Sequence, residues 1–126
     1  MVIKKALTVA NIQSQKITRI PFTGQFFEAY RQPQNKGVWF VWGTSSSGKS
    51  SFMMQMAKEL AKTQKVLYNL LEEEMDDSDF IERTELFQMH EVKDNFLVGR
   101  YTIAELLEYL KRRNSPKVII IDSATY

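Results

Sequence analysis

A glycine- and serine-rich segment followed by a lysine is the strongest chemical signal in this 126-residue chain. It reads Gly43-Thr44-Ser45-Ser46-Ser47-Gly48-Lys49-Ser50, which matches the P-loop pattern G-x-x-x-x-G-K-[ST]. Its glycines let the loop curl so that backbone N–H groups point inward at phosphate oxygens. We expect Lys49 to reach the β- and γ-phosphates, and the hydroxyl of Ser50 to ligate Mg²⁺. With Ser51 included, the segment predicts a site for ATP and Mg²⁺.

A second signal is an apolar run that ends in an acid. The run Val118–Ile121 is followed by Asp122 and Ser123, which is the Walker B pattern. A buried strand of this kind delivers a carboxylate to the edge of a sheet, where it orients a water on Mg²⁺. The sequence therefore predicts that Asp122 and Ser50 hold the metal, one directly and one through water.

A third signal is the acidic run Glu72-Glu73-Glu74, which follows an expected strand over Lys65–Leu71. Hydrolysis of a nucleotide needs a group that positions the attacking water, and ligands of α/β sheets bind at the carboxyl edge. Glu72 and Glu73 are both candidates for this catalytic role, and the sequence leaves the choice open. The acids that follow (Asp76, Asp77 and Asp79) are interpreted as a solvated turn and a helix cap.

The elements around these motifs alternate between strands and helices. Continuous apolar runs, typical of strands buried on both faces, cover Val38–Trp42, Lys65–Leu71, Asn95–Val98 and Lys117–Ile121. Helical spacing predicts helices over Lys49–Lys62, over Asp79–Met89 with Asp79 and Glu82 as a capping pair, and behind the capping box Thr102–Glu105. This order predicts an α/β fold with a mainly parallel sheet and helices on both faces.

Composition and charge restrict the class of protein further. The chain is 44% apolar and 25% charged, has no cysteine and one histidine, and lacks an apolar run long enough for a membrane span. We expect one cytoplasmic domain, with residues 1–37 as a lead-in arm and residues 38–126 as the P-loop core. Residues 1–66 carry a balance of +8 and residues 67–126 a balance of −6. The basic lead-in permits contact with DNA, although the halves could also neutralise each other.

The order P-loop, helix, strand with acidic end and Walker B resembles the RecA-like ATPases, which include RecA and RadA recombinases and DnaB-type helicases. The segment Val66–Glu73 is similar to the family's strand followed by Glu-Glu, and Phe22–Phe26 is similar to its lead-in. The resemblance covers roughly residues 20–126. It implies a three-layer fold, ATP hydrolysis with Mg²⁺, a catalytic glutamate after the second strand, and a role in DNA recombination, repair or unwinding. Asp122 is followed by serine rather than glutamate, which disfavours an AAA+ protein.

The chain also departs from the family pattern, because it stops four residues after Asp122. RecA-like domains continue with further strands, and one of these lies between the P-loop and Walker B strands. We therefore expect a fragment of a longer chain or a sheet that closes differently, with self-association or a partner that completes the sheet. Two alternative functions are a nucleotide-gated interaction module with little hydrolysis and a P-loop kinase that acts on a small molecule.

Overall fold

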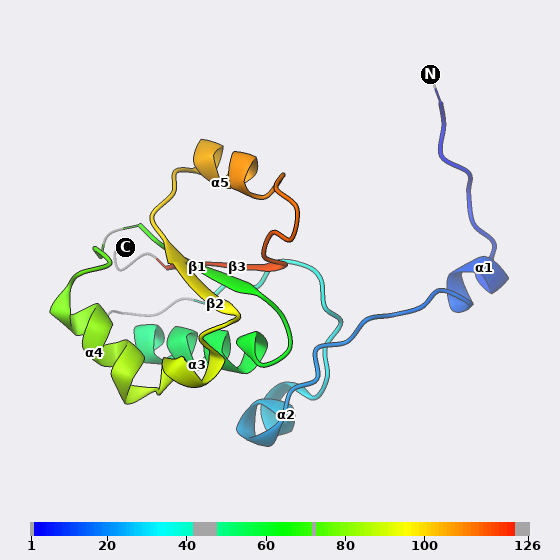
Figure 1. Cartoon of the computed structure of the whole chain (residues 1–126). Coiled ribbons are helices and arrows are strands. Elements are labelled where there is room, and N and C mark those ends of the chain that lie inside the picture. The colour runs from blue at the N-terminus through cyan, green and yellow to red at the C-terminus, as the bar shows by residue number, and fades with distance from the viewer. Residues whose placement is uncertain (1, 42–47, 72, 123–126) are drawn as a thin grey trace.

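The computed structural model describes residues 2–41, 48–71 and 73–122, and these contain a three-stranded parallel sheet (Figure 1). The strands are β1 (Val66–Leu70), β2 (Phe96–Gly99) and β3 (Val118–Asp122), in the spatial order β2-β1-β3. In the register, Leu70 of β1 lies opposite Asp122 of β3. The parallel sheet of an α/β protein, expected from the continuous apolar runs, is confirmed.

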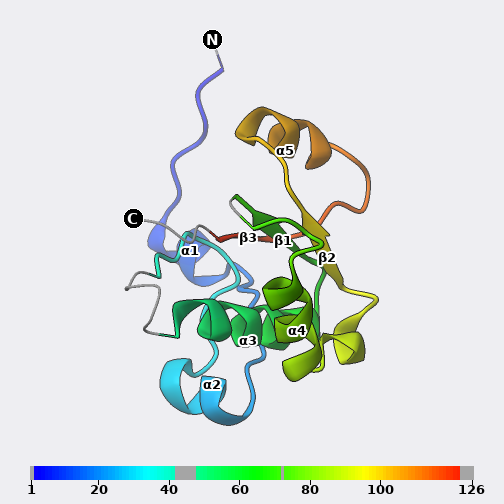
Figure 2. The ribbon, with the colours of Figure 1, turned by 90° about the vertical axis from the view of Figure 1, so that its left-hand side faces the viewer.

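Helices lie on both faces of the sheet, as expected (Figures 1 and 2). One face carries α3 (Lys49–Ala61), α4 (Ser78–Leu86) and the short 3₁₀ helix η2 (Met89–Val92), and the other carries α5 (Ile103–Tyr109). The chain moves outward from β1 to β2 through α4 and returns from β2 to β3 through α5. Because the two connections run in opposite directions on opposite faces, they share one hand, as parallel crossovers require. In the described ranges, no helix combines the length and apolar character needed to cross a bilayer.

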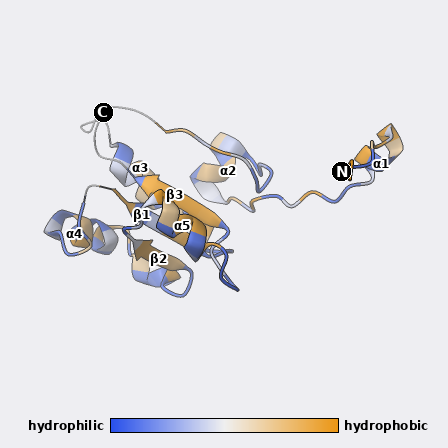
Figure 3. Ribbon diagram, turned by 90° about the horizontal axis from the view of Figure 1, so that it is seen from above, coloured by the Kyte–Doolittle hydropathy of each residue, from blue (hydrophilic) through white to orange (hydrophobic). Residues whose placement is uncertain are grey.

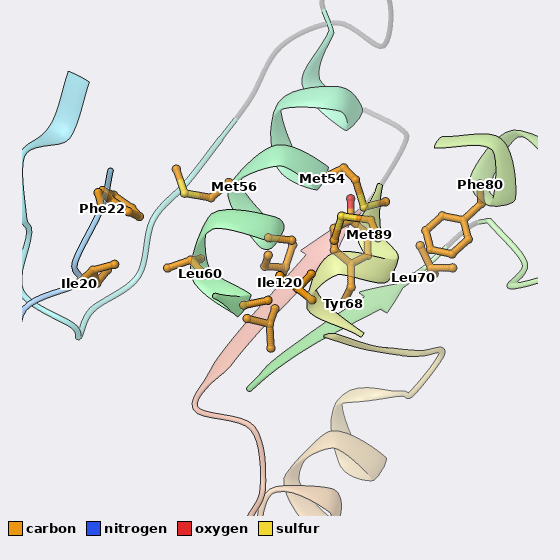
Figure 4. Packing of buried hydrophobic residues seen from close by; sticks show 14 residues of the cluster. Ile20, Phe22, Met54, Met56, Leu60, Tyr68, Leu70, Phe80, Met89 and Ile120 are labelled. Atoms are coloured by element: carbon orange, nitrogen blue, oxygen red, sulfur yellow. The ribbon is translucent and has the colours of Figure 1, made fainter. Parts of the chain in front are cut away.

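The hydrophobic core lies between α3 and the sheet (Figure 4). Side chains of a strand alternate between faces, so Val66, Tyr68 and Leu70 of β1 all point toward α3. Met54 and Ala57 of α3 meet them, and neither is exposed. The core thus fixes how α3 is held against β1 and β3, which are the elements that carry the sequence motifs.

The lead-in divides into a projecting part and a docked part. Its first helix, α1 (Val9–Gln13), stands away from the body of the molecule (Figure 3), whereas α2 (Gly24–Tyr30) lies beside α3. Phe22 is only 2% exposed and belongs to the core cluster. The backbone N–H and the hydroxyl of Thr23 donate to the carboxylate of Glu59 on α3, at 3.1 to 3.3 Å. The docked part therefore shares the core of the sheet and α3.

The expected buried strand over Val38–Trp42 is wrong for its described residues, 38–41. These residues lie outside the sheet, and the side chains of Val38 and Phe40 are 81% and 82% exposed. Both edges of β1 are already paired, with β2 and with β3. Trp39 instead packs its ring against those of Phe22 and Tyr30, with ring centroids 6.4 and 5.5 Å apart. Trp42 lies outside the described residues.

The structure contains the three helices that the spacing predicts, and one of their two predicted caps is wrong. The box around Thr102 is confirmed, because its hydroxyl accepts from the N–H of Glu105 and its own N–H donates to the Glu105 carboxylate. The expected capping pair of Asp79 and Glu82 is wrong, since α4 begins at Ser78. The preceding residue, Asp77, turns its carboxylate back to accept from the N–H of Glu74 at 2.9 Å. A turn, rather than a side-chain cap, thus leads into α4.

Candidate functional site

The P-loop sequence leads into the first turn of α3. Residues Gly43, Thr44, Ser45, Ser46 and Ser47 lie outside the described residues. Gly48 is the residue before the helix, with a left-handed backbone (φ +80°, ψ 15°) that a side chain would oppose. Lys49, Ser50 and Ser51 form the first turn of the helix and are partly buried. Figure 1 shows this turn on the side of the sheet where β1 and β3 end, so helix start and strand ends face one region.

Asp122 ends β3 at this edge and is held by a tyrosine of the neighbouring strand. Its side chain belongs to the buried part of the molecule, with the residue 7% exposed. The hydroxyl of Tyr68, a fully buried residue of β1, donates to Oδ2 of Asp122 at 2.6 Å. Burial, and then the bond to Asp122 and its negative charge, raise the pKa of Tyr68 far above its usual range. The hydroxyl therefore stays protonated and acts as a donor to the carboxylate.

Leu71, the residue before the acidic run, lies beside Asp122. The N–H of Leu71 donates to the carbonyl oxygen of Asp122 at 3.2 Å. Glu72 lies outside the described residues. Glu73 pairs with Arg83 of α4, with the carboxylate oxygen 2.6 Å from the guanidinium nitrogen. Of the two candidates that the sequence offers, Glu73 is the one that the structure describes, and its carboxylate has a cationic partner.

Arg83 connects α4 to this group of side chains. Only 15% of its side chain and 23% of that of Glu73 are exposed. Its guanidinium lies over the ring of Phe80, 5.6 Å from the centroid. The Nε atom of Arg83 is buried without a hydrogen-bond partner among the described residues, so Glu73 provides the main compensation for the buried charge.

Sequence reasoning missed Tyr68 and Arg83. Tyr68 lies 54 residues from Asp122, and only the register of β1 and β3 brings the two together. A hydroxyl-bearing residue inside an apolar strand was the available signal, since a buried hydroxyl needs a partner. Arg83 had no comparable signal, because a lone arginine in a polar helix is ordinary.

The donor chemistry at this edge fits Mg²⁺. The Asp122 carboxylate and the Ser50 hydroxyl are hard oxygen donors, at the end of β3 and in the first turn of α3. Mg²⁺ is commonly bound by one or two such protein oxygens together with phosphate oxygens and water. Both donors are of the type that Mg²⁺ accepts from proteins, and they come from the two elements that meet at this edge.

A separate surface hollow of about 410 Å³ lies between α2, α3 and η2. Its charged groups pair with one another: Lys58 with Glu91 at 2.6 Å, and Lys62 with Glu59 at 2.8 Å. The residues that line the hollow come from helices and their flanking turns, and none of them belongs to β1 or β3. We assign it no ligand, because these contacts make its charges part of the packing between helices.

Comparisons of the chain with models of protein families, with curated proteins and with solved structures found no match. The function of the site is therefore inferred from its own residues. Three features of the chain bear on it: the P-loop sequence, the buried carboxylate of Asp122 and the paired Glu73.

Proposed function

We propose that this chain binds ATP with Mg²⁺ and hydrolyses it, as an ATPase of the RecA-like group. The observation that carries the proposal is a combination of sequence and structure. The P-loop pattern Gly43–Ser50 runs into α3, whose first turn lies at the same sheet edge as the buried Asp122. A phosphate-binding helix start and a metal-binding carboxylate are the two parts that P-loop enzymes bring together.

Each residue of this edge has a distinct role in the proposal. The N–H groups of the P-loop and of the α3 start surround the phosphates, and Lys49 adds a positive charge to the β- and γ-phosphates. Ser50 and Asp122 hold the metal, the first directly and the second through a water. When bound, Mg²⁺ neutralises phosphate charge and keeps the phosphate oxygens in place.

The hydrolytic water is assigned to Glu72 rather than Glu73. Glu73 is engaged with Arg83 at 2.6 Å, and moving it away would leave a largely buried guanidinium uncompensated. Glu72 is the first acid in the sequence after β1, the strand that pairs with β3. Its carboxylate would orient the water that attacks phosphorus, with ADP as the leaving group.

The RecA-like arrangement is supported by two neighbouring strand ends that both carry acids. β1 leads to Glu72 and Glu73, and its direct neighbour β3 ends in Asp122. Since α3 and α4 share one face, connections of the same hand place the segment before α3 on the β3 side of β1. This is where a P-loop strand belongs in the family. Among the described strands β3 lies at the end of the sheet, and its outer edge suits a further strand from this chain, a second copy or a partner.

The test is calorimetric titration with ATP and Mg²⁺ of the native chain and of two lysine variants on the same helix. Lys49→Ala should weaken binding at least ~10-fold through loss of a charged phosphate contact. Lys58→Ala is the matched control, because Lys58 lies in the last turn of α3, where it pairs with Glu91 of η2, and this variant should keep native affinity. No binding by the native chain, or equal binding by Lys49→Ala, would overturn the proposal.

A further inference from the structure

The hydroxyl of Tyr68 needs an explanation that packing does not give. The ring of Tyr68 lies between those of Phe80 and Phe96, with centroid distances of 6.2 and 5.9 Å. A phenylalanine would fill this space equally well. The hydroxyl adds a buried polar group, which destabilises the fold unless it is hydrogen-bonded. Its partner is Oδ2 of Asp122 at 2.6 Å, so the polar atom is directed at the carboxylate assigned to the metal.

The strand register makes this contact a diagonal one. Tyr68 lies opposite Ile120, and Leu70 lies opposite Asp122, so the tyrosine reaches forward by two positions along the neighbouring strand. Side chains at such diagonal positions are about 7–8 Å apart at their bases, a gap that a long aromatic side chain can span. The contact thus approaches Asp122 from the core side of the sheet, where Tyr68 is packed.

A neutral donor has a different effect on a carboxylate from a cation. A tyrosine hydroxyl fixes the orientation of the carboxylate and leaves its negative charge in place, whereas a guanidinium would neutralise it. Arg83, a cation of this region, is bound to Glu73 at 2.6 Å. The contact from Tyr68 to Oδ2 orients Asp122 without adding a positive charge that would compete with Mg²⁺.

We propose that Tyr68 is a positioning residue for the metal-binding carboxylate: its hydroxyl holds Asp122 in the orientation that receives the water on Mg²⁺. The inference rests on the proposed function, because it assumes that Asp122 serves Mg²⁺-ATP. Partners that orient metal ligands typically contribute about 10-fold or more to metal affinity. The role is distinct from chemistry, since Tyr68 touches neither the nucleotide nor the metal.

The measurement that tests the role is the factor by which Mg²⁺ tightens ATP binding, obtained by titrating the full chain with ATP in excess Mg²⁺ and in EDTA. For Tyr68→Phe we expect unchanged affinity in EDTA and an Mg²⁺ factor roughly 10-fold smaller than that of the native chain. A purely structural role would weaken both titrations together. Tyr101→Phe, at a tyrosine whose ring stacks on Tyr109, is the control and should behave as the native chain.

A double variant connects the effect to Asp122. Asp122→Asn should reduce the Mg²⁺ factor by itself, and adding Tyr68→Phe to it should produce no further reduction. If Tyr68→Phe fails to fold, 4-fluorophenylalanine at position 68 fills the space of the hydroxyl without donating, and the same loss is expected.

The outcomes separate the two proposals. If the native chain shows no ATP binding, the proposed function fails and the role of Tyr68 fails with it. If the native chain binds ATP more tightly with Mg²⁺ and Tyr68→Phe keeps the full factor, only the role of Tyr68 is overturned. An equal loss in Mg²⁺ and in EDTA would also overturn it, in favour of a structural role.

Discussion

Two carboxylates stand at neighbouring strand ends and are held in opposite ways. Asp122, at the end of β3, accepts from the neutral hydroxyl of Tyr68, whereas Glu73, after β1, pairs with the positive charge of Arg83. The first partner orients a charge and preserves it, and the second cancels it. Position at the carboxyl edge therefore does not by itself leave the charge of an acid available to a ligand. The partner decides whether its charge remains available to a ligand.

The largest expected effect comes from comparing the two glutamates. Glu72→Gln should reduce ATP turnover by about 100-fold or more and leave ATP binding intact, because the amide cannot act as a base for the water. Glu73→Gln should keep turnover within about 3-fold of native, because its carboxylate serves Arg83. Steady-state phosphate release measures both. Reversed effects would assign the catalytic role to Glu73, and no loss in either variant would remove a glutamate base from the account.

Breaking the ion pair between Arg83 and Glu73 should affect the stability of the fold more than ATP turnover. Arg83→Met removes the cation and leaves Glu73 with a partly buried, uncompensated charge. We expect the free energy of unfolding to fall by roughly 1–3 kcal/mol, below the range for fully buried pairs because both side chains keep some contact with water. Denaturant unfolding monitors the change. Adding Glu73→Gln should recover part of the loss, and a strictly additive double variant would contradict the pairing.

Much of this comparison was visible in the sequence, because local signals encode local structure. The helix over Lys49–Ala61, the capping box at Thr102 and the three strands of the sheet follow from spacing and caps within short windows. The two acidic strand ends were therefore located correctly. Their partners were not, since Tyr68 meets Asp122 only through the register of β1 with β3, which no short window contains.

The apolar run at residues 38–41 also shows that a short stretch of sequence does not determine strand pairing. Its composition is that of a buried strand, yet residues 38–41 pair with none of the three strands, and β1 is flanked by β2 and β3. The run instead meets the lead-in through Trp39 and the rings of Phe22 and Tyr30. The predicted cap of α4 was wrong for a more local reason. The carboxylate of Asp77, the residue before the helix, accepts from the N–H of Glu74 instead of capping the helix.

A basic lead-in and an acidic strand edge also differ in the partners that they favour. Lys4, Lys5, Lys16 and Arg19 are exposed, and we expect them to supply any contact with DNA phosphates. If DNA binds there, affinity should fall steeply with salt, and replacing Lys4 and Lys5 by Ala should reduce the slope of log affinity against log salt by about 2. Fluorescence anisotropy with a labelled oligonucleotide measures this slope. An unchanged slope, or no binding at low salt, would remove DNA from the proposal.

The smallest effect is expected at the exposed ion pair of Lys58 and Glu91. This pair provides a reference for the largely buried pair of Arg83 and Glu73. The bond from Lys58 lowers the pKa of Glu91 below its usual value. Since the folded-state pKa is the lower one, this pair stabilises the fold above the unfolded-state pKa and stops doing so as pH falls through the folded-state pKa. Glu91→Gln should therefore lower the melting temperature slightly at pH 7, and less so at low pH or high salt. A loss as large as that of Arg83→Met would contradict the distinction by burial.

The most direct test of the account locates the metal and nucleotide in the molecule. Mn²⁺ can replace Mg²⁺ beside a non-hydrolysable ATP analogue, and its unpaired electrons broaden the amide NMR signals of nearby residues in the ¹⁵N-labelled chain. We predict that broadening centres on Gly48–Ser51 and on Leu71 and Asp122, with α5 (Ile103–Tyr109) unaffected, and that Asp122→Asn reduces it. Broadening centred elsewhere, or none at the start of α3, would contradict the assignment of this sheet edge as the ATP site.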